Sequence, residues 1–210
     1  MLPQRLTAVL LSWPLLALMG VSISYWISYG KEEKLRSGKQ HIAYNRLFLT
    51  LVAIGYFAIW PSWVGAIVLL CLNLYYAALE SLVFSFPWVF IVQIMGLVVL
   101  YVGSLFFAWA IGSAGKQLRP STSGIRANHG LVQHGPLGIV RHPYYVSYVL
   151  ILVGLALALT TPWLLLLALC VVIGMGPTAK AEEEQLRALF GEEYEQYQQR
   201  VGRFCPKLFG

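Results

Sequence analysis

The sequence contains no aspartate and few charged residues of any kind, since only 11% of its 210 residues are charged. An average soluble domain carries about 25% charged residues, so this chain has too little polar surface to cover a water-soluble globule. The missing aspartate excludes catalytic dyads that depend on this residue. A Walker loop, a GxGxxG turn and a Gly-x-Ser-x-Gly elbow are absent too, which excludes the soluble nucleotide-binding folds.

Cysteine is also scarce. Cys71 and Cys170 lie inside apolar runs, and Cys205 lies near the end of the sequence. Three widely spaced cysteines without a CxxC pair argue against a disulfide framework, a zinc site or redox chemistry.

Long apolar runs are abundant, because 58% of the residues are apolar and the mean hydropathy is +0.67. A helix needs about 20 apolar residues to cross the roughly 30 Å hydrocarbon core of a bilayer. We therefore predict an all-α integral membrane protein that forms one membrane domain over residues 1–210, with residues 1–113 as its amino-terminal transmembrane part. The candidate spans are residues 6–28, 47–60, 64–80, 88–113, 145–159 and 162–178.

Two pairs of these runs are separated by short connections that contain proline. Trp60-Pro61-Ser62-Trp63 divides the second run from the third, and Thr160-Thr161-Pro162 divides the fifth from the sixth. Proline stops a helix and tryptophan favours the membrane interface, so each pair is predicted to form a helical hairpin. The alternative that the second and third runs form one merged span stays open, so the sequence predicts five or six transmembrane helices.

Lys and Arg outnumber Asp and Glu by 15 to 9, and membrane topology explains most of this excess without a nucleic-acid partner. If all six runs span, the amino terminus, the loop over residues 114–144 and the carboxyl tail share one side with ten basic residues, against five over residues 31–46. Cytoplasmic segments carry an excess of Lys and Arg, so we expect the first side to face the cytoplasm. Merging the second and third runs would divide the basic residues differently.

A polar loop with three of the four histidines precedes the fifth run. Its notable residues are His129, Gly130, His134, Gly135, Pro136, Gly138, Arg141, His142 and Pro143. Glycine and proline shape a loop that can approach a ligand closely, and an arginine at the start of a span suits a lipid phosphate or a ligand carboxylate. The histidines have no acidic or thiol neighbour and no metal-binding helical spacing, so we expect no metal site.

A second polar stretch, residues 180–201, follows Gly174, Gly176 and Pro177, which we expect to end or kink the sixth span. Its apolar positions step by three or four and predict an amphipathic helix: Leu186, Leu189, Phe190, Tyr194, Tyr197 and Val201. Glu182 lies one turn before this stripe and is expected to face the apolar side. Glu183 is placed for a surface pair with Arg187, four residues further on.

Both stretches resemble the isoprenylcysteine carboxyl methyltransferase and phospholipid methyltransferase superfamily of membrane enzymes. The family pattern is His-x-Leu-Val, Gly-x-Tyr and Arg-His-Pro-x-Tyr-x-Gly before a helical hairpin, then Glu-Glu and Phe-Gly-x-x-Tyr-x-x-Tyr. The counterparts here are His129 to Val132, Gly135 to Leu137, Arg141 to Tyr145, Glu182-Glu183, Phe190-Gly191, Tyr194 and Tyr197. Two positions depart from this pattern.

Leu137 replaces the tyrosine of Gly-x-Tyr, and Ser147 replaces the glycine that ends the Arg-His-Pro motif. Thr178 falls near the arginine with which methyltransferases of prenylated cysteine hold their substrate. The resemblance therefore does not support that particular substrate.

The resemblance implies a methyltransferase-like cofactor-binding region over residues 114–210 that holds S-adenosylmethionine at the cytoplasmic face. The implied cofactor-binding residues are His129, Gly130, Leu131, Val132, Gly135, Leu137, Arg141, His142, Pro143, Tyr144, Tyr145 and Glu182. Arg141 and Glu183 are the catalytic candidates, Arg141 as a clamp for a carboxylate and Glu183 as a base if the acceptor is an amine.

The implied reaction is methyl transfer to a lipophilic acceptor, meaning a carboxylate, thiol or amine of a lipid or lipid-modified molecule. The protein would be multi-pass, in the inner membrane of a bacterium or the endoplasmic reticulum of a eukaryote. Two other functions stay open. The related sterol reductases share the His-Pro-x-Tyr layout and use NADPH, although their Asn-Tyr-Leu-Gly-Asp segment is missing after His142-Pro143. The other is a non-catalytic protein that retains the fold.

Overall fold

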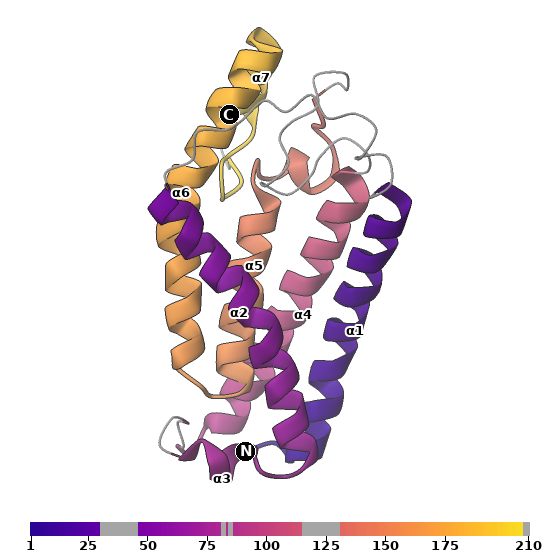
Figure 1. Ribbon diagram of the computed structural model, residues 1–210, viewed down its shortest axis with the longest axis vertical. Helices are drawn as coiled ribbons and strands as arrows, with labels where there is room; N and C mark the ends of the chain where they lie inside the picture. The colour runs from indigo at the N-terminus through magenta and orange to yellow at the C-terminus, as the bar shows by residue number, and fades with distance from the viewer. Residues whose placement is uncertain (30–45, 81–82, 84–85, 115–130, 208–210) are drawn as a thin grey trace.

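Five long helices run up and down the long axis of the molecule (Figure 1). The computed structural model describes residues 1–29, 46–80, 83, 86–114 and 131–207. The long helices are α1 (Gln4–Tyr29), α2 (Arg46–Cys71), α4 (Val89–Ala114), α5 (Pro143–Ala158) and α6 (Trp163–Phe190). Shorter elements are α3 (Tyr75–Ala78), the 3-10 helix η3 (Gly135–Gly138) and α7 (Glu192–Arg200). Over these ranges the only strand-like feature is one isolated bridge, which confirms the all-α prediction.

Four helices are long and apolar enough to cross a membrane: Gln4–Ser24 within α1, Arg46–Cys71, Val89–Ser113 within α4, and Trp163–Phe190. α5 is a shorter apolar helix of 16 residues, with a length of about 24 Å. It packs against α4 and α6 and is antiparallel to both (Figure 1). The chain is thus a multi-pass membrane protein, and the predicted hairpin of the fifth and sixth runs is confirmed as α5 and α6.

The hairpin predicted around Pro61 is wrong, because α2 continues through this proline as one helix. The next residue, Ser62, donates its hydroxyl to Ala58 O at 2.6 Å. Trp63 is buried and donates its indole N–H to Leu11 O of α1 at 3.1 Å. Proline is tolerated inside transmembrane helices where hydroxyl groups and neighbouring helices satisfy polar backbone atoms. Trp63 therefore marks a contact between helices and not the end of a span.

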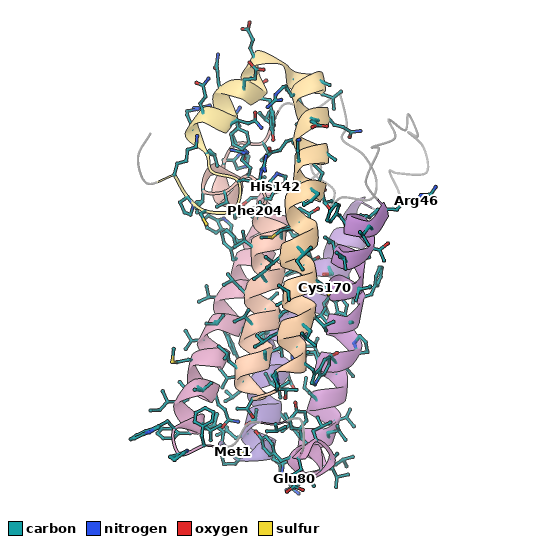
Figure 2. All side chains as sticks on the ribbon, turned by 90° about the vertical axis from the view of Figure 1, so that its left-hand side faces the viewer. Met1, Arg46, Glu80, His142, Cys170 and Phe204 are labelled. Carbon is teal, nitrogen blue, oxygen red and sulfur yellow. The ribbon has the colours of Figure 1, made fainter. Side chains whose placement is uncertain are left out.

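The two ends of the bundle carry different parts of the chain. Figure 2 shows Met1 and Glu80 at one end, which we call the lower end, and Arg46, His142 and Phe204 at the other, the upper end. The expectation that the amino terminus and the carboxyl tail share one side is therefore wrong. It fails because merging the second and third runs into α2 removes one crossing of the membrane.

Glycines bring α4 and α5 into close contact. A Cβ atom added to Gly154 of α5 would lie 2.5 Å from the backbone nitrogen of Leu100 and 2.9 Å from the carbonyl oxygen of Gly96, both on α4. Small residues let the backbones of transmembrane helices approach, so that dispersion forces hold them where lipid offers no hydrophobic gain. This packing fixes the position of α5 in the bundle.

α6 continues through Gly174, Gly176 and Pro177 without ending, contrary to the prediction. Thr178, directly after the proline, donates its hydroxyl to Gly174 O at 2.7 Å. The 28 residues of α6 span about 42 Å, more than the roughly 30 Å hydrocarbon core. Its last turns therefore project beyond the membrane and carry Glu182 and Glu183 to the upper end.

The predicted amphipathic helix over residues 180–201 is two helices. α6 ends at Phe190, and Gly191 turns the chain with a φ of +52° before α7 begins. That φ lies in the left-handed region, which glycine adopts without strain. Residues of the predicted apolar stripe nevertheless pack together. Tyr194, Tyr197 and Val201 form a buried cluster, and Leu186 and Phe190 pack against it.

Candidate functional site

Arg141 and His142 lie at the upper end of the bundle, directly before Pro143, the first residue of α5. Proline suits this position because its missing N–H needs no helical partner there. Val140 forms a parallel bridge with Gly202. The N–H of Arg141 donates to Gly202 O at 2.8 Å, and that of His142 donates to Arg203 O at 3.1 Å. The motif before α5 is thereby held beside the segment that follows α7, as the labels of His142 and Phe204 show in Figure 2.

Glu183 of α6 is the centre of a charged cluster that we define as Arg141, His142, Glu182, Glu183 and Arg203. Its Oε1 accepts hydrogen bonds from Arg141 Nε and Arg203 Nε, each at 3.0 Å. Its Oε2 accepts from Arg203 Nη2 at 2.5 Å and from Gln198 Nε2 at 3.2 Å. Buried charges persist when they are paired and hydrogen-bonded. The side chain of Glu183 is 4% exposed and both of its oxygens are engaged.

His142 lies between the two glutamates. Its Nε2 is 3.1 Å from Glu183 Oε1 and its Nδ1 is 3.3 Å from Glu182 Oε2. Burial by itself lowers the pKa of this imidazole, but the hydrogen bonds and charges of both glutamates outweigh burial and raise the pKa above its ordinary value. The cluster thus favours an imidazolium that donates from both nitrogens.

Glu182 is less enclosed than Glu183. Its Oε1 accepts the hydroxyl of Tyr145 at 3.0 Å, and its side chain is 13% exposed. The prediction that Glu182 faces inward is confirmed. The predicted surface pair of Glu183 with Arg187 is wrong, because Arg187 donates to Gln198 Oε1 at 2.8 Å and lies 3.8 Å from Glu195. Periodicity misplaced Glu183 because a local apolar stripe carries no information about cations in other segments.

Other residues implied by the resemblance are not members of the charged cluster. Val132 and Leu137 are buried, and Leu131 packs against the tyrosines of α7. Leu137 also accepts the hydroxyl of Tyr197 at its carbonyl oxygen, at 2.5 Å. Its apolar side chain fills buried space where the family pattern has tyrosine.

Gly135 and Tyr144 contact α4. Gly135 has a φ of +62°, and a Cβ atom there would lie 2.8 Å from Cβ of Ser113. Both features require glycine. Tyr144 donates to Ala110 O of α4 at 3.3 Å, so it turns toward α4 while Tyr145 turns toward α6. The remaining two, His129 and Gly130, lie outside the described residues.

Ser147 and Thr178 are buried inside helices and bonded to their own backbone. Ser147 donates to Pro143 O at 2.8 Å and Thr178 to Gly174 O at 2.7 Å. A serine or threonine hydroxyl commonly bonds the carbonyl four residues earlier in this way. Ser147 therefore fits the site of a family glycine, and Thr178 is not arranged to replace an arginine.

The sequence pattern does not single out Arg203 or Phe204, which the structure adds to the site. Arg203 donates hydrogen bonds to Glu183 from both Nε and Nη2. The ring of Phe204 lies 5.7 Å from that of His142 and 6.4 Å from that of Tyr145 between centroids. Nothing in the local sequence distinguishes Arg203 from Arg200 or Lys207, so this role depends on contacts with distant segments.

The fold and the charged cluster define a class: a multi-pass helical membrane protein with a buried ionic site at one end of its bundle. Within the described ranges, no group of three or more His, Cys, Asp or Glu is arranged to hold a metal ion. The two glutamates of the cluster face arginines and a histidine, which suits an organic ligand with charged groups.

Comparison with known proteins finds similar membrane methyltransferases. Residues 91–193 match the family model described as phospholipid methyltransferase. Two relatives, both named probable protein-S-isoprenylcysteine O-methyltransferase, from Oryza sativa subsp. indica and subsp. japonica, are 32% identical over 121 residues, which is 55% of this chain and 61% of each relative. The chain thus matches about three fifths of the length of these relatives.

A solved structure has a similar fold. It is the eukaryotic intramembrane Ras methyltransferase named isoprenylcysteine carboxyl methyltransferase, with a TM-score of 0.51 and 22% identity, over 78% of this chain and 54% of that one. The family model and the relatives support a resemblance to the isoprenylcysteine carboxyl methyltransferase and phospholipid methyltransferase superfamily, and the solved structure supports the fold. The resemblance carried by the sequence motifs is confirmed.

Proposed function

We propose that the chain transfers a methyl group from S-adenosylmethionine to a lipophilic acceptor at the cytoplasmic face of its membrane. The charged cluster carries this proposal, because it joins the two motif stretches of the superfamily. Arg141 and His142 come from one stretch, and Glu182 and Glu183 from the other. Their meeting at the upper end of the bundle sets a polar site beside the apolar spans (Figure 2).

The residues present fit S-adenosylmethionine, whose amino-acid part bears an ammonium and a carboxylate. Glu182 is partly exposed, so its carboxylate oxygens can accept a further hydrogen bond from the ammonium or from a ribose hydroxyl. Glu183 has no such capacity, since Arg141, His142, Arg203 and Gln198 already engage it. We therefore assign Arg141 and Glu183 to positioning the site and not to proton transfer. When bound, the cofactor supplies an electrophilic methyl group on a positively charged sulfur.

The acceptor is a lipophilic molecule that approaches from the bilayer. A carboxylate or thiolate acceptor needs no proton removed, whereas an amine would need a base. The relatives are named for an isoprenylcysteine acceptor, which makes a lipid-linked carboxylate the first acceptor to test. Thr178, bonded to Gly174 within α6, offers it no cationic group.

Charge distribution supports a cytoplasmic upper end. Among described residues, the segments at the upper end carry Arg46 at the start of α2, Arg141 before α5, Lys180 and Arg187 in the later part of α6, and Arg200, Arg203 and Lys207 at the end of α7 and after it. Arg5 lies in the first turn of α1, at the lower end with Met1. Cytoplasmic segments are enriched in Lys and Arg. We therefore propose that the ionic site opens to the cytoplasm.

The proposal is tested by titrating the purified protein in detergent micelles with S-adenosylmethionine, its demethylated product and NADPH. We expect selective binding of the first two ligands. Glu182→Ala should weaken this binding about tenfold or more, the loss expected for a hydrogen bond to a charged group. Glu184→Ala is the matched control, because Glu184 is exposed and lies two positions further along the same helix.

Selective binding of NADPH would replace the proposal with a membrane reductase, and binding of no nucleotide would favour a non-catalytic protein. Equal losses in Glu182→Ala and Glu184→Ala would show that the inward face of α6 does not hold the cofactor. Transfer of labelled methyl groups into a lipid extract, measured with the same protein, would then identify the acceptor class.

A further inference from the structure

The charged cluster contains more cationic groups than carboxylates. Arg141, His142 and Arg203 are the cations, and Glu182 and Glu183 are the carboxylates. With His142 protonated, the cluster carries one positive charge in excess. Such a site is suited to a ligand with an anionic group, provided that one of the cations has hydrogen-bond donors to offer.

Arg141 and His142 have few hydrogen-bond donors left for a ligand, because both are engaged within the protein. Arg141 is 9% exposed, and its Nε and Nη2 contact Glu183. Its Nη1 donates to the carbonyl oxygens of Gln198 and Val201. Both ring nitrogens of His142 are engaged by the two glutamates. Binding a ligand through either residue would break contacts that satisfy buried charges, at a large cost in free energy.

Arg203 differs from both. Its Nε and Nη2 form a two-point contact with Glu183, while its Nη1 makes no hydrogen bond with the part of the chain that the structure describes. Its side chain is 39% exposed. A guanidinium carries five N–H donors in one plane, so a carboxylate on one edge fixes the direction of the other edge.

The backbone also holds Arg203 in place. Its carbonyl oxygen accepts the N–H of His142 at 3.1 Å, and the ring of the next residue, Phe204, lies 5.7 Å from the imidazole. Arg203 is therefore preorganised: its position is set by the cluster before any ligand binds. Preorganisation lowers the entropic cost of binding.

We propose that Arg203 binds the carboxylate of a ligand in this site through the edge of its guanidinium that faces away from Glu183. The inference rests on the proposed function and deepens it. The carboxylate belongs either to the amino-acid part of S-adenosylmethionine or to the methyl acceptor. Arg203 is then a binding residue, and Glu183 positions it.

The test compares ligand pairs that differ in one carboxylate. The first pair is S-adenosylmethionine and its decarboxylated form, and the second is S-farnesylcysteine and its methyl ester. Each is titrated by calorimetry into wild-type protein, Arg203→Gln and Arg200→Gln, in micelles. Arg200 is the matched control, because it is exposed and donates to Gln133 away from the cluster.

We expect wild-type protein to prefer the carboxylate member of one pair by about tenfold or more, and Arg203→Gln to abolish that preference. The pair affected identifies the source of the carboxylate. Arg200→Gln should keep the preference. Arg203→Lys should restore part of it, because a lysine keeps the charge but not the planar fork.

If Arg203→Gln weakens both members of each pair equally, its role is only structural and the inference is overturned, while the proposed function stands. Wild-type protein that binds S-adenosylmethionine without any carboxylate preference in either pair would also overturn it. Absence of S-adenosylmethionine binding by wild-type protein would instead overturn the proposed function, and the inference with it.

Discussion

At the scale of single residues, two adjacent glutamates have different tasks. Glu183 binds three cations from two segments: Arg141 and His142 before α5, and Arg203 after α7. Glu182 contacts His142 and Tyr145 and keeps part of its surface exposed. A buried carboxylate with all its hydrogen bonds made stabilises the site, whereas one with remaining capacity can bind a ligand. The sequence pattern predicts Glu182 at the site but not the enclosed position of Glu183.

The charge state of His142 predicts how stability depends on pH. Glu182 and Glu183 raise the pKa of His142 in the folded protein above its value in the unfolded chain. The folded state therefore binds this proton more tightly, and the stabilisation is complete below the unfolded pKa of about 6.5. It is lost as the pH rises through the higher pKa of the folded protein.

We expect thermal unfolding in micelles to occur at a lower temperature as the pH increases over that range. The groups that face the imidazole are Glu182 and Glu183 of α6, Tyr145 of α5 and the adjacent Arg141 and Arg203. His142→Gln should lose this pH dependence, while His134→Gln, which changes an exposed histidine, should keep it. An identical pH profile in His142→Gln would show that another group is responsible.

At the scale of elements, proline has a different effect in this membrane bundle from the one that its local preference predicts. Pro61 and Pro177 both lie inside continuous helices. Each is followed by a hydroxyl residue, Ser62 or Thr178, that bonds the carbonyl four residues earlier. Propensity alone predicts a helix end at proline, but without water in the bilayer the continuous helix is the way to satisfy the remaining backbone groups.

The contact between α4 and α5 predicts a sensitive glycine. In Gly154→Ala the new Cβ would lie 2.5 Å from the backbone nitrogen of Leu100, so the helices must separate. We expect a loss of about 1–3 kcal/mol in the free energy of unfolding, as for other overpacked sites. Denaturation in micelles measures it.

Gly65→Ala in α2 is the control for this prediction. No atom lies within 4 Å of a Cβ there, and replacing a helical glycine by alanine is worth about 0.5–1 kcal/mol of stability. The two substitutions should therefore shift the unfolding midpoint in opposite directions. A neutral Gly154→Ala would mean that the α4–α5 contact is looser than the structure indicates.

At the scale of the whole molecule, the number of spans decides which chain segments share a side. With α2 as a single helix, residues 141–143 and 201–207 lie at the upper end with the start of α2, and the amino terminus lies at the lower end (Figures 1 and 2). Hydropathy finds the apolar runs but does not decide whether a proline between two of them is a turn. The side of the membrane on which the site lies depends on whether the chain turns at this proline.

Thiol labelling in membrane vesicles tests this topology. Cys205 is exposed near the charged cluster, and Glu80 is exposed at the lower end (Figure 2). In a variant that keeps Cys205 as its only cysteine, we expect a membrane-impermeant reagent to react from the cytoplasmic side. In a variant with Glu80→Cys as its only cysteine, the reaction should occur from the opposite side.

A variant that keeps only Cys170 is the control, because this residue lies midway along the spanning part of α6 (Figure 2) and should react from neither side. Labelling of Cys205 and of the Glu80→Cys thiol from the same side would contradict a bundle with five passes.

The sequence by itself determines that the protein is a helical membrane protein and that two polar stretches carry its chemistry. Both are properties of local composition, which adds up along the chain. Only the tertiary structure decides that Glu183 is enclosed by cations, that Arg203 and Phe204 complete the site, and that α2 crosses once. These depend on contacts between segments far apart in sequence, where the energies of ion pairing and backbone satisfaction in a nonpolar environment outweigh local preferences.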